Sequence, residues 1–127
     1  MDKLINSVKL LVDGELIDAN KKFPMFSSNH EAYAVLVEEI EEAEYETERI
    51  KYYLNNLWMS VKNNSKEYEL LKTLKLTAMK AAAENIQIAA MAQKFIDSEA
   101  IRENTRVLPT VCSKCKDLII NDESATE

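Results

Sequence analysis

The stretch that decides the fold, residues 28–62, reads SNHEAYAVLVEEIEEAEYETERIKYYLNNLWMSVK. It opens on Ser28 with Glu31 three residues later, a capping box that predicts a helix start at about residue 29. Apolar side chains then recur every three or four residues, as in the buried stripe of an amphipathic helix. This predicted stripe consists of Leu36, Ile40, Ala43, Thr47, Ile50, Leu54, Leu57 and Val61. The segment predicts one long helix over 29–62.

Two further helices are predicted beside this segment. Residues 2 to about 22 carry apolar side chains at helical spacing, and Pro24 ends that pattern. After the polar turn 62–65, Asn64 and Glu67 can cap a third helix that continues to about residue 98. Because long helices joined by a short turn pack side by side, 29–62 and 65–98 predict an antiparallel hairpin. We expect an all-α, antiparallel helical bundle that this hairpin and the N-terminal helix form, completed by oligomerisation.

The composition agrees with one helical domain. The 127 residues suffice for one core, and a single glycine with two prolines leaves few turns for a many-stranded fold. A net charge of −6 offers no basic surface for nucleic acid. No run of about 18 apolar residues predicts a membrane span, and acids interrupt the N-terminal apolar stretch too early for a secretory signal. We therefore expect a cytoplasmic protein that binds neither nucleic acid nor membrane.

The C-terminal part of the chain differs from the rest. We expect a helical domain over 1–108 and an extension over 109–127, whose polar end has little to bury and is predicted to be disordered. The extension holds Cys112 and Cys115, a single CxxC pair. Such a pair is half of a structural zinc site, a redox pair or two incidental thiols, and an incidental or dimer-dependent role is favoured.

Seven glutamates crowd residues 38–48. At about 100° per residue they divide into two groups on opposite flanks of the apolar stripe. One group can converge on a cation and consists of Glu38, Glu39, Glu42 and Glu46; the other consists of Glu41, Glu44 and Glu48. Hard ions such as Mg²⁺ take carboxylate oxygens at this kind of spacing. The alternative is an ordinary solvated helix face, balanced in part by nearby lysine and arginine.

A second helix must complete such a site. Glu84 and Gln87 lie three residues apart on one face of an alanine-rich apolar stretch, where polar side chains need partners. Antiparallel packing would bring Glu84 opposite Glu38 and Glu42. Lys80, one turn before Glu84, can contact a phosphate or balance Glu84.

These residues carry a resemblance to a known family. The stretches SSNHEAYAVLVEEIEEAEYE at 27–46 and AAENIQIAAMAQKFI at 82–96 resemble the all-α nucleoside triphosphate pyrophosphohydrolases of the MazG-like superfamily, particularly short phage and prophage members. Those proteins carry EExxE on one helix and ExxD on the next. Here the first motif is residues 38–42, and the second is residues 84–87 with Gln87 in place of the aspartate. Gln87 offers a neutral amide oxygen instead of a carboxylate.

The resemblance implies a Mg²⁺-dependent hydrolase, with Mn²⁺ as a possible substitute, that converts a (d)NTP to the monophosphate and pyrophosphate and serves nucleotide-pool housekeeping. The metal ligands that it implies are Glu38, Glu42, Glu84 and Gln87. Glu39 is expected as a further ligand or as the catalytic base, and Lys80 as a contact to substrate. A homo-oligomer, dimer or tetramer, is also expected. The alternative is a non-catalytic helical oligomer, or a regulatory or adaptor protein, that retains the family fold.

Overall fold

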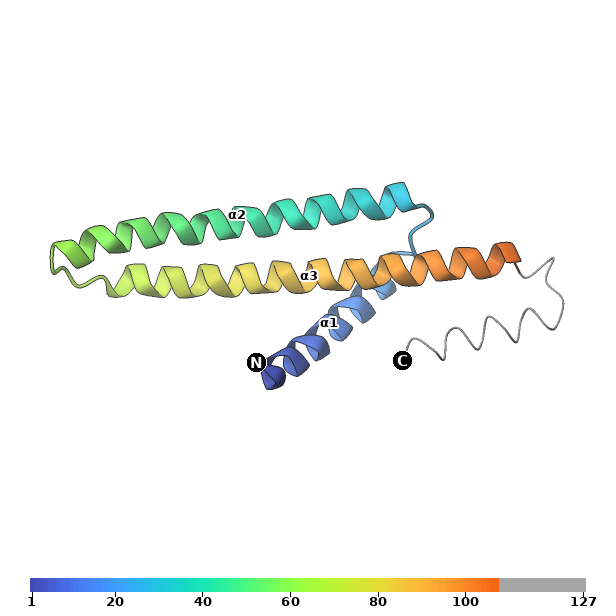
Figure 1. Cartoon of the computed structure of the whole chain (residues 1–127), viewed down its shortest axis with the longest axis horizontal. Coiled ribbons are helices and arrows are strands. Elements are labelled where there is room, and N and C mark those ends of the chain that lie inside the picture. Colours follow the sequence, from blue (N-terminus) through green and yellow to red (C-terminus); the bar gives the residue numbers. More distant parts are fainter. Residues whose placement is uncertain (108–127) are drawn as a thin grey trace.

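A computed structural model describes residues 1–107 of the chain, and this part is all-helical. Its three helices are α1 (Asp2–Lys22), α2 (Asn29–Lys62) and α3 (Tyr68–Val107), and residues 1–107 contain no strand (Figure 1). None of these helices has an apolar stretch long enough to cross a membrane. The all-α prediction is confirmed. The predicted extension 109–127, with Cys112 and Cys115, lies outside the described residues.

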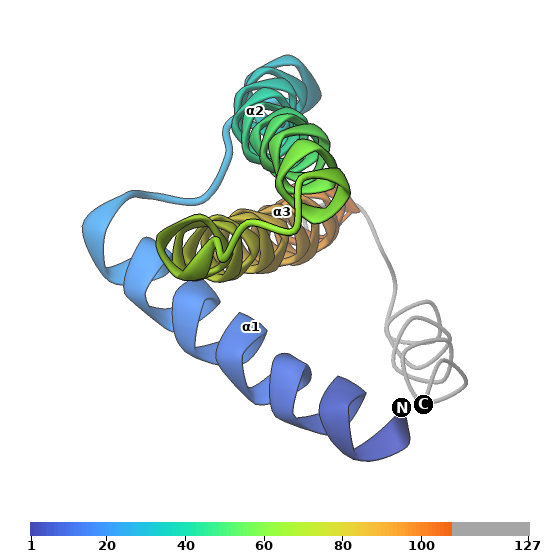
Figure 2. The same ribbon diagram turned by 90° about the vertical axis from the view of Figure 1, so that its left-hand side faces the viewer.

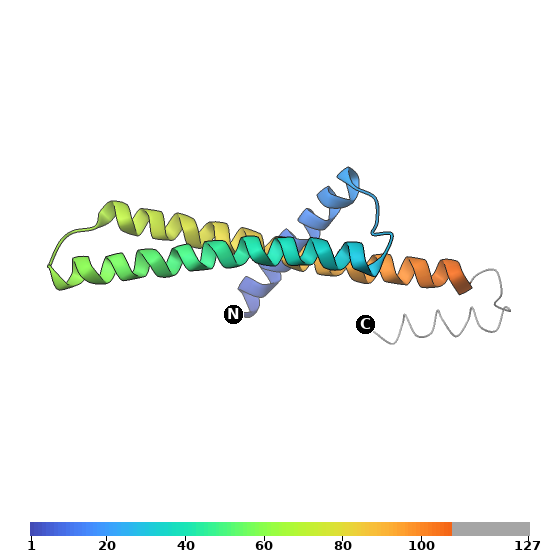
Figure 3. The ribbon, with the colours of Figure 1, turned by 90° about the horizontal axis from the view of Figure 1, so that it is seen from above.

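The two long helices form the predicted antiparallel hairpin. α2 and α3 lie side by side along their length, and α1 crosses α3 on the side opposite α2 (Figures 2 and 3). α1 accordingly packs against α3 and not against α2. No residue of α1 is buried. The hairpin is thus the core of the fold, and α1 is an arm laid across one of its helices.

The predicted helix start at Ser28 is confirmed. Ser28 Oγ accepts a hydrogen bond from the Glu31 amide at 3.1 Å. The Glu31 carboxylate accepts from the backbone N–H of Ser27, also at 3.1 Å, instead of from that of Ser28. Both bonds satisfy amides that the first helical turn leaves without partners. They fix the direction in which the chain enters α2.

The turn between α2 and α3 corrects one prediction. Asn64 does not cap the third helix; it has φ of 54°, and it ends α2 instead. The Asn64 amide donates to Val61 O at 3.2 Å and the Ser65 amide to Ser60 O at 2.9 Å, the bond pattern of a Schellman motif. Asparagine tolerates this left-handed conformation better than most residues do. α3 therefore begins at Tyr68, three residues later than predicted.

α3 also continues beyond the predicted end at residue 98. Ser98 lies inside the helix, is 1% exposed, and its Oγ accepts a hydrogen bond from the Phe26 amide at 2.9 Å. Because no glycine or proline interrupts residues 98–107, α3 runs to Val107. Its last turns reach the start of α2, where Arg102 donates to Asn29 Oδ1. These bonds close the open end of the hairpin.

The contact between α2 and α3 follows a heptad pattern of alternating steps of four and three residues. On α2 the buried or half-buried positions of this seam are Ala32, Leu36, Glu39, Ala43, Glu46, Ile50, Tyr53, Leu57 and Ser60. On α3 they are Leu70, Leu74, Thr77, Ala81, Glu84, Ile88, Met91, Phe95 and Ser98. Three glutamates thus occupy positions that apolar residues fill in an ordinary helical hairpin.

The predicted stripe of α2 was half wrong. Leu36, Ala43, Ile50 and Leu57 do face α3, but the other four seam positions are shifted by one residue. Ile40, Leu54 and Val61 are 42%, 56% and 54% exposed. A prediction from periodicity assigns apolar residues to the buried face of a helix. This chain has more apolar side chains than its three helices can cover, so some of them stay exposed. The displaced residues form a second apolar stripe on the outside of the hairpin.

The seam depends on small side chains at its centre. Ala43 and Ala81 are 6% and 7% exposed, and alanine lets the two helix backbones approach closely.

We expect Ala81→Leu to lower the free energy of unfolding by about 1–3 kcal/mol, because extra methyl groups in a packed contact force the helices apart. Urea denaturation measures the change. Ala82→Leu, on the exposed neighbour, should stay within about 0.5 kcal/mol of wild type, and equal effects at both positions would contradict the seam.

Candidate metal centre

Three carboxylates from two helices meet near the middle of the seam. Glu39 and Glu42 of α2 and Glu84 of α3 each offer an oxygen, and the three oxygens lie within 4.8 Å of one another. Glu39 and Glu84 are half-buried seam residues, whereas Glu42 is exposed one turn further along α2. Antiparallel packing brings Glu84 to Glu39, 45 positions away in the chain, and to Glu42, 42 positions away, as the sequence predicted for Glu42. We call Glu39, Glu42 and Glu84 the carboxylate trio.

Gln87 joins the trio through its side-chain amide. With its nitrogen turned toward the acids, Nε2 donates to Glu39 Oε2 at 3.0 Å and to Glu84 Oε2 at 3.2 Å. The opposite orientation would aim the amide oxygen at the same two carboxylate oxygens, which is favourable only with a cation between them. The amide at position 87 therefore suits both a metal-free and a metal-bound site. A carboxylate there would add a fourth negative charge.

The trio is electrostatically strained. Burial raises the pKa of Glu39, and the neighbouring charges of Glu42, Glu84 and Glu38 raise it further. The pKa of Glu84 is raised by burial, then by the charge of Glu42 and a hydrogen bond with it, and by the charge of Glu46. Carboxylates this close repel one another when ionised, and a bound cation would offset that repulsion. No ion pair of the described residues supplies a lysine or arginine to the trio.

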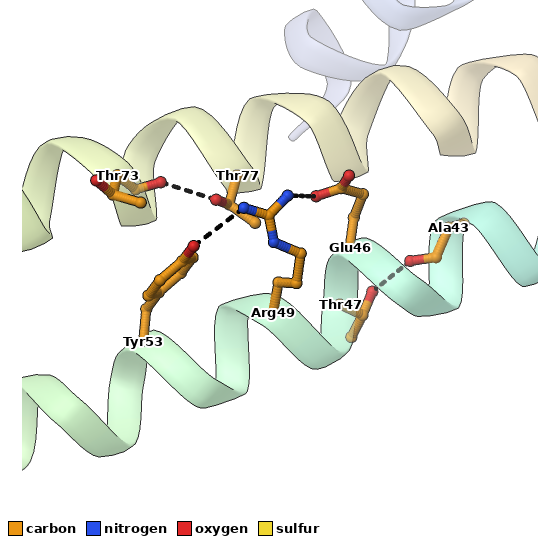
Figure 4. Close-up of polar contacts among 7 residues, drawn as sticks. All are labelled: Ala43, Glu46, Thr47, Arg49, Tyr53, Thr73 and Thr77. Carbon is orange, nitrogen blue, oxygen red and sulfur yellow. Dashed lines mark hydrogen bonds and ion pairs between the residues drawn. The ribbon is translucent and has the colours of Figure 1, made fainter.

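Glu46, also on the seam, has a cation of its own. Arg49 Nη1 lies 3.6 Å from Glu46 Oε2, and Arg49 Nη2 donates to the Tyr53 hydroxyl at 3.0 Å (Figure 4). The guanidinium also lies 5.8 Å from the ring centroids of both Tyr45 and Tyr53. Sequence reasoning missed this cluster, although its i, i+3 and i, i+4 spacing on one helix was visible. Arg49 thus places a cation beside Glu46, whereas none of the ion pairs within residues 1–107 places one beside the trio.

Two predicted site residues lie outside the trio. Glu38 is exposed, beside Glu39, and lines the hollows on both sides of the trio. Lys80 is exposed on α3 and lines neither hollow. Glu39, expected as a further ligand or as the catalytic base, is a member of the trio. The structure thus brings Glu39, Glu42, Glu84 and Gln87 together, with Glu38 at the border.

A cleft of about 480 Å³ opens beside the trio, between α1 and the hairpin. We call it the α1 cleft. Its apolar wall includes Phe23, Phe26, Val35, Ala90 and Met91. Glu38, Glu39 and Gln87 line it next to the trio, and Lys94 lines it toward Phe26. Sequence reasoning did not single out Lys94, although a lysine in the apolar stretch 88–96 was a signal.

Comparisons of the chain with family models, curated proteins and solved structures gave no match. The all-α three-helix fold rests on the structure itself. The MazG-like resemblance stays a prediction from the two sequence stretches that carry it.

The raised pKa of Glu84 predicts how metal-free stability depends on pH. Above the ordinary glutamate value of 4.5, the folded state binds more protons than the unfolded state, so the free energy of unfolding falls as pH rises through this window. Glu84→Gln removes that dependence, and we expect it to raise the melting temperature at pH 7 in EDTA and to flatten the pH profile. Thermal unfolding between pH 4 and 8 measures both.

The matched control is Glu44→Gln, an exposed carboxylate on α2 outside the trio. It should leave the profile close to wild type. A Glu84→Gln protein that is less stable than wild type at pH 7 would show that the trio is not strained.

Proposed function

We propose that this chain is a Mg²⁺-dependent nucleoside triphosphate pyrophosphohydrolase, which converts a (d)NTP and water to the (d)NMP and pyrophosphate. One observation carries the proposal: Glu39, Glu42 and Glu84 meet within 4.8 Å from two helices, without a basic partner in the described ion pairs. The resemblance of residues 27–46 and 82–96 supports the same activity. The role would be housekeeping of the nucleotide pool in the cytoplasm.

The donor set suits a hard divalent cation. Mg²⁺ and Mn²⁺ prefer oxygen ligands, and one to a few carboxylates with retained water are common at sites that take phosphates. The trio supplies three carboxylates, and a half-turn of the Gln87 amide adds a neutral oxygen. A bound cation would also offset the repulsion that raises the pKa values of Glu39 and Glu84. Gln87 therefore does not preclude a metal site.

Bound Mg²⁺ would supply Lewis acidity that neutralises the triphosphate. In the reaction, a water oxygen forms a bond to the α-phosphorus while the bond from that phosphorus to the bridging oxygen of pyrophosphate breaks. Glu38, which borders the trio and lines the α1 cleft, would orient this water and accept its proton. Glu39, Glu42 and Glu84 would hold the cation, and the Gln87 amide oxygen would add a neutral ligand. Positioning and charge stabilisation account for most of the rate.

The activity is tested with a panel of (d)NTPs in Mg²⁺ or Mn²⁺, with separate detection of pyrophosphate and orthophosphate. Wild type should release pyrophosphate, and Glu42→Gln should lower kcat by about a hundredfold or more, because a carboxylate that would hold the charge-stabilising cation is lost. Mg²⁺ should raise the melting temperature of wild type but not of Glu42→Gln.

Glu44→Gln is again the control and should stay within about twofold of wild-type kcat, as its exposed carboxylate lies outside the trio. If no nucleotide yields metal-dependent pyrophosphate, or if Glu42→Gln turns over as fast as wild type, the hydrolase proposal is wrong. The non-catalytic alternative would then be favoured.

We also propose that the chain forms a homo-oligomer, a dimer or tetramer. The outer stripe of α2, formed by Ile40, Leu54 and Val61, is exposed, and so are Leu4 and Leu11 of α1. Large apolar side chains left exposed on two helices are surface that association between copies of the chain would cover. No other helix within residues 1–107 covers these side chains.

Leu54→Lys should weaken this association, because a charge would enter an apolar contact. Sedimentation over a range of protein concentrations measures the change, and Asn55→Lys, on the exposed neighbour of Leu54, should leave the mass unaltered. A wild-type protein that sediments as a monomer at every concentration would refute the proposal.

A further inference from the structure

Lys94 is buried and makes no direct ion pair, although Glu31 lies within reach of its charge. Its side chain is on α3, the residue is 2% exposed, and Nζ lies 5.0 Å from the centroid of the Phe26 ring. None of the ion pairs found in the described residues includes it. Taking an ammonium group out of water is costly, and attraction to one aromatic face offsets only part of that cost. A largely buried lysine that lines a cleft and makes no side-chain hydrogen bond or direct ion pair within residues 1–107 is available to a ligand in that cleft.

The α1 cleft has two unlike ends. Glu39 and Gln87 lie at the trio end, and Lys94 lies further along α3 beside Phe26. Residues 87 and 94 are separated by about 10 Å along the helix axis, given a rise of 1.5 Å per residue. This is similar to the span between the α-phosphate and the outer edge of the base in a nucleotide. A nucleotide whose phosphates are at the trio would place its base edge near Lys94.

The charges of the cleft exclude a phosphate group at the Lys94 end. Five carboxylates line the cleft, those of Glu15, Asp18, Glu31, Glu38 and Glu39, against the two ammonium groups of Lys22 and Lys94. This excess of negative charge repels a second anion but tolerates a neutral polar group. The apolar wall suits a flat ring, and small-molecule sites commonly combine such a wall with one or two polar contacts. A nucleobase meets these conditions.

We propose that the α1 cleft binds the base of the nucleotide and that Lys94 selects bases with a carbonyl oxygen on their outer edge. This inference rests on the proposed function, because it places the phosphates at the trio. A lysine ammonium has three donors and no acceptor. It can donate to O4 of uracil and thymine or to O6 of guanine and hypoxanthine, whereas the amino groups of cytosine and adenine face it with donors only. Lys94 is therefore a specificity-determining residue.

Two substrate pairs isolate the proposed contact, because each pair differs at the outer edge by an oxygen against an amino group. They are dUTP with dCTP, and dITP with dATP. We expect wild type to favour the oxygen-bearing member of each pair by about tenfold or more in kcat/KM, as removal of a hydrogen bond to a charged donor has effects of this size. Wild-type ratios near one would overturn the inference without any variant.

The variants then assign the preference to Lys94. Lys94→Met keeps the length of the side chain but removes the donors, and both ratios should fall to near one through a higher KM for dUTP and dITP. Lys94→Arg keeps a charged donor and should retain a preference for oxygen. Lys75→Met removes an exposed lysine of the same helix and should match wild type. Ratios that are unchanged in Lys94→Met would refute the role of Lys94.

A binding measurement separates this inference from the hydrolase proposal. Calorimetry with Mg²⁺ and the α,β-imido analogues of dUTP and dCTP reports base preference without hydrolysis. Preferential binding of the dUTP analogue, lost in Lys94→Met, supports the base site even if no triphosphate is hydrolysed. Equal release of pyrophosphate from all four substrates supports the hydrolase and refutes the base site.

Discussion

Repulsion among carboxylates held at a helix contact is the constraint on which this structure depends. Glu39 and Glu84 occupy seam positions where a heptad hairpin normally places apolar residues, and Glu42 brings a third charge beside them. Such an arrangement persists only when the surrounding contacts hold the helices in place. Glu46, on the same seam, shows the other solution, because Arg49 lies beside it and is itself held by a hydrogen bond to the Tyr53 hydroxyl. None of the ion pairs within residues 1–107 gives the trio such a partner. This difference makes the trio a candidate cation site.

Two anchors hold the trio in register. The Schellman turn at Asn64 ends α2 and sets the direction in which the chain continues to α3. The hydrogen bond from the Phe26 amide to Ser98 Oγ closes the other end of the hairpin. Small residues between them, Ala43 and Ala81, let the helices approach closely. The same closing bond positions Phe26 against Lys94, so that the geometry of the α1 cleft and the register of the seam share one support.

The sequence predicted the helices, the hairpin and the approach of Glu42 to Glu84, because periodicity and capping are local signals that long helices express strongly. At alternate positions of α2, the predicted buried residue lies one position after the residue that faces α3. Ile40 and Leu54 are apolar yet exposed, while Glu39 and Tyr53 are turned toward α3. Pattern analysis assumes that apolar residues are covered by their own chain, and that assumption fails where apolar surface exceeds what the chain can cover. The α1 cleft was beyond prediction because it depends on the angle at which α1 crosses α3.

The closing bond between Phe26 and Ser98 has a consequence for how the molecule assembles. It joins residues 72 positions apart, whereas the bonds at the Asn64 turn join near neighbours. Closing a long loop costs more chain entropy than closing a short one, so the hairpin forms outward from the turn and the cleft closes last. Reversed in time, the cleft end is the first part of the hairpin to open. A ligand bound in the α1 cleft would stabilise this end of the hairpin and so slow its opening.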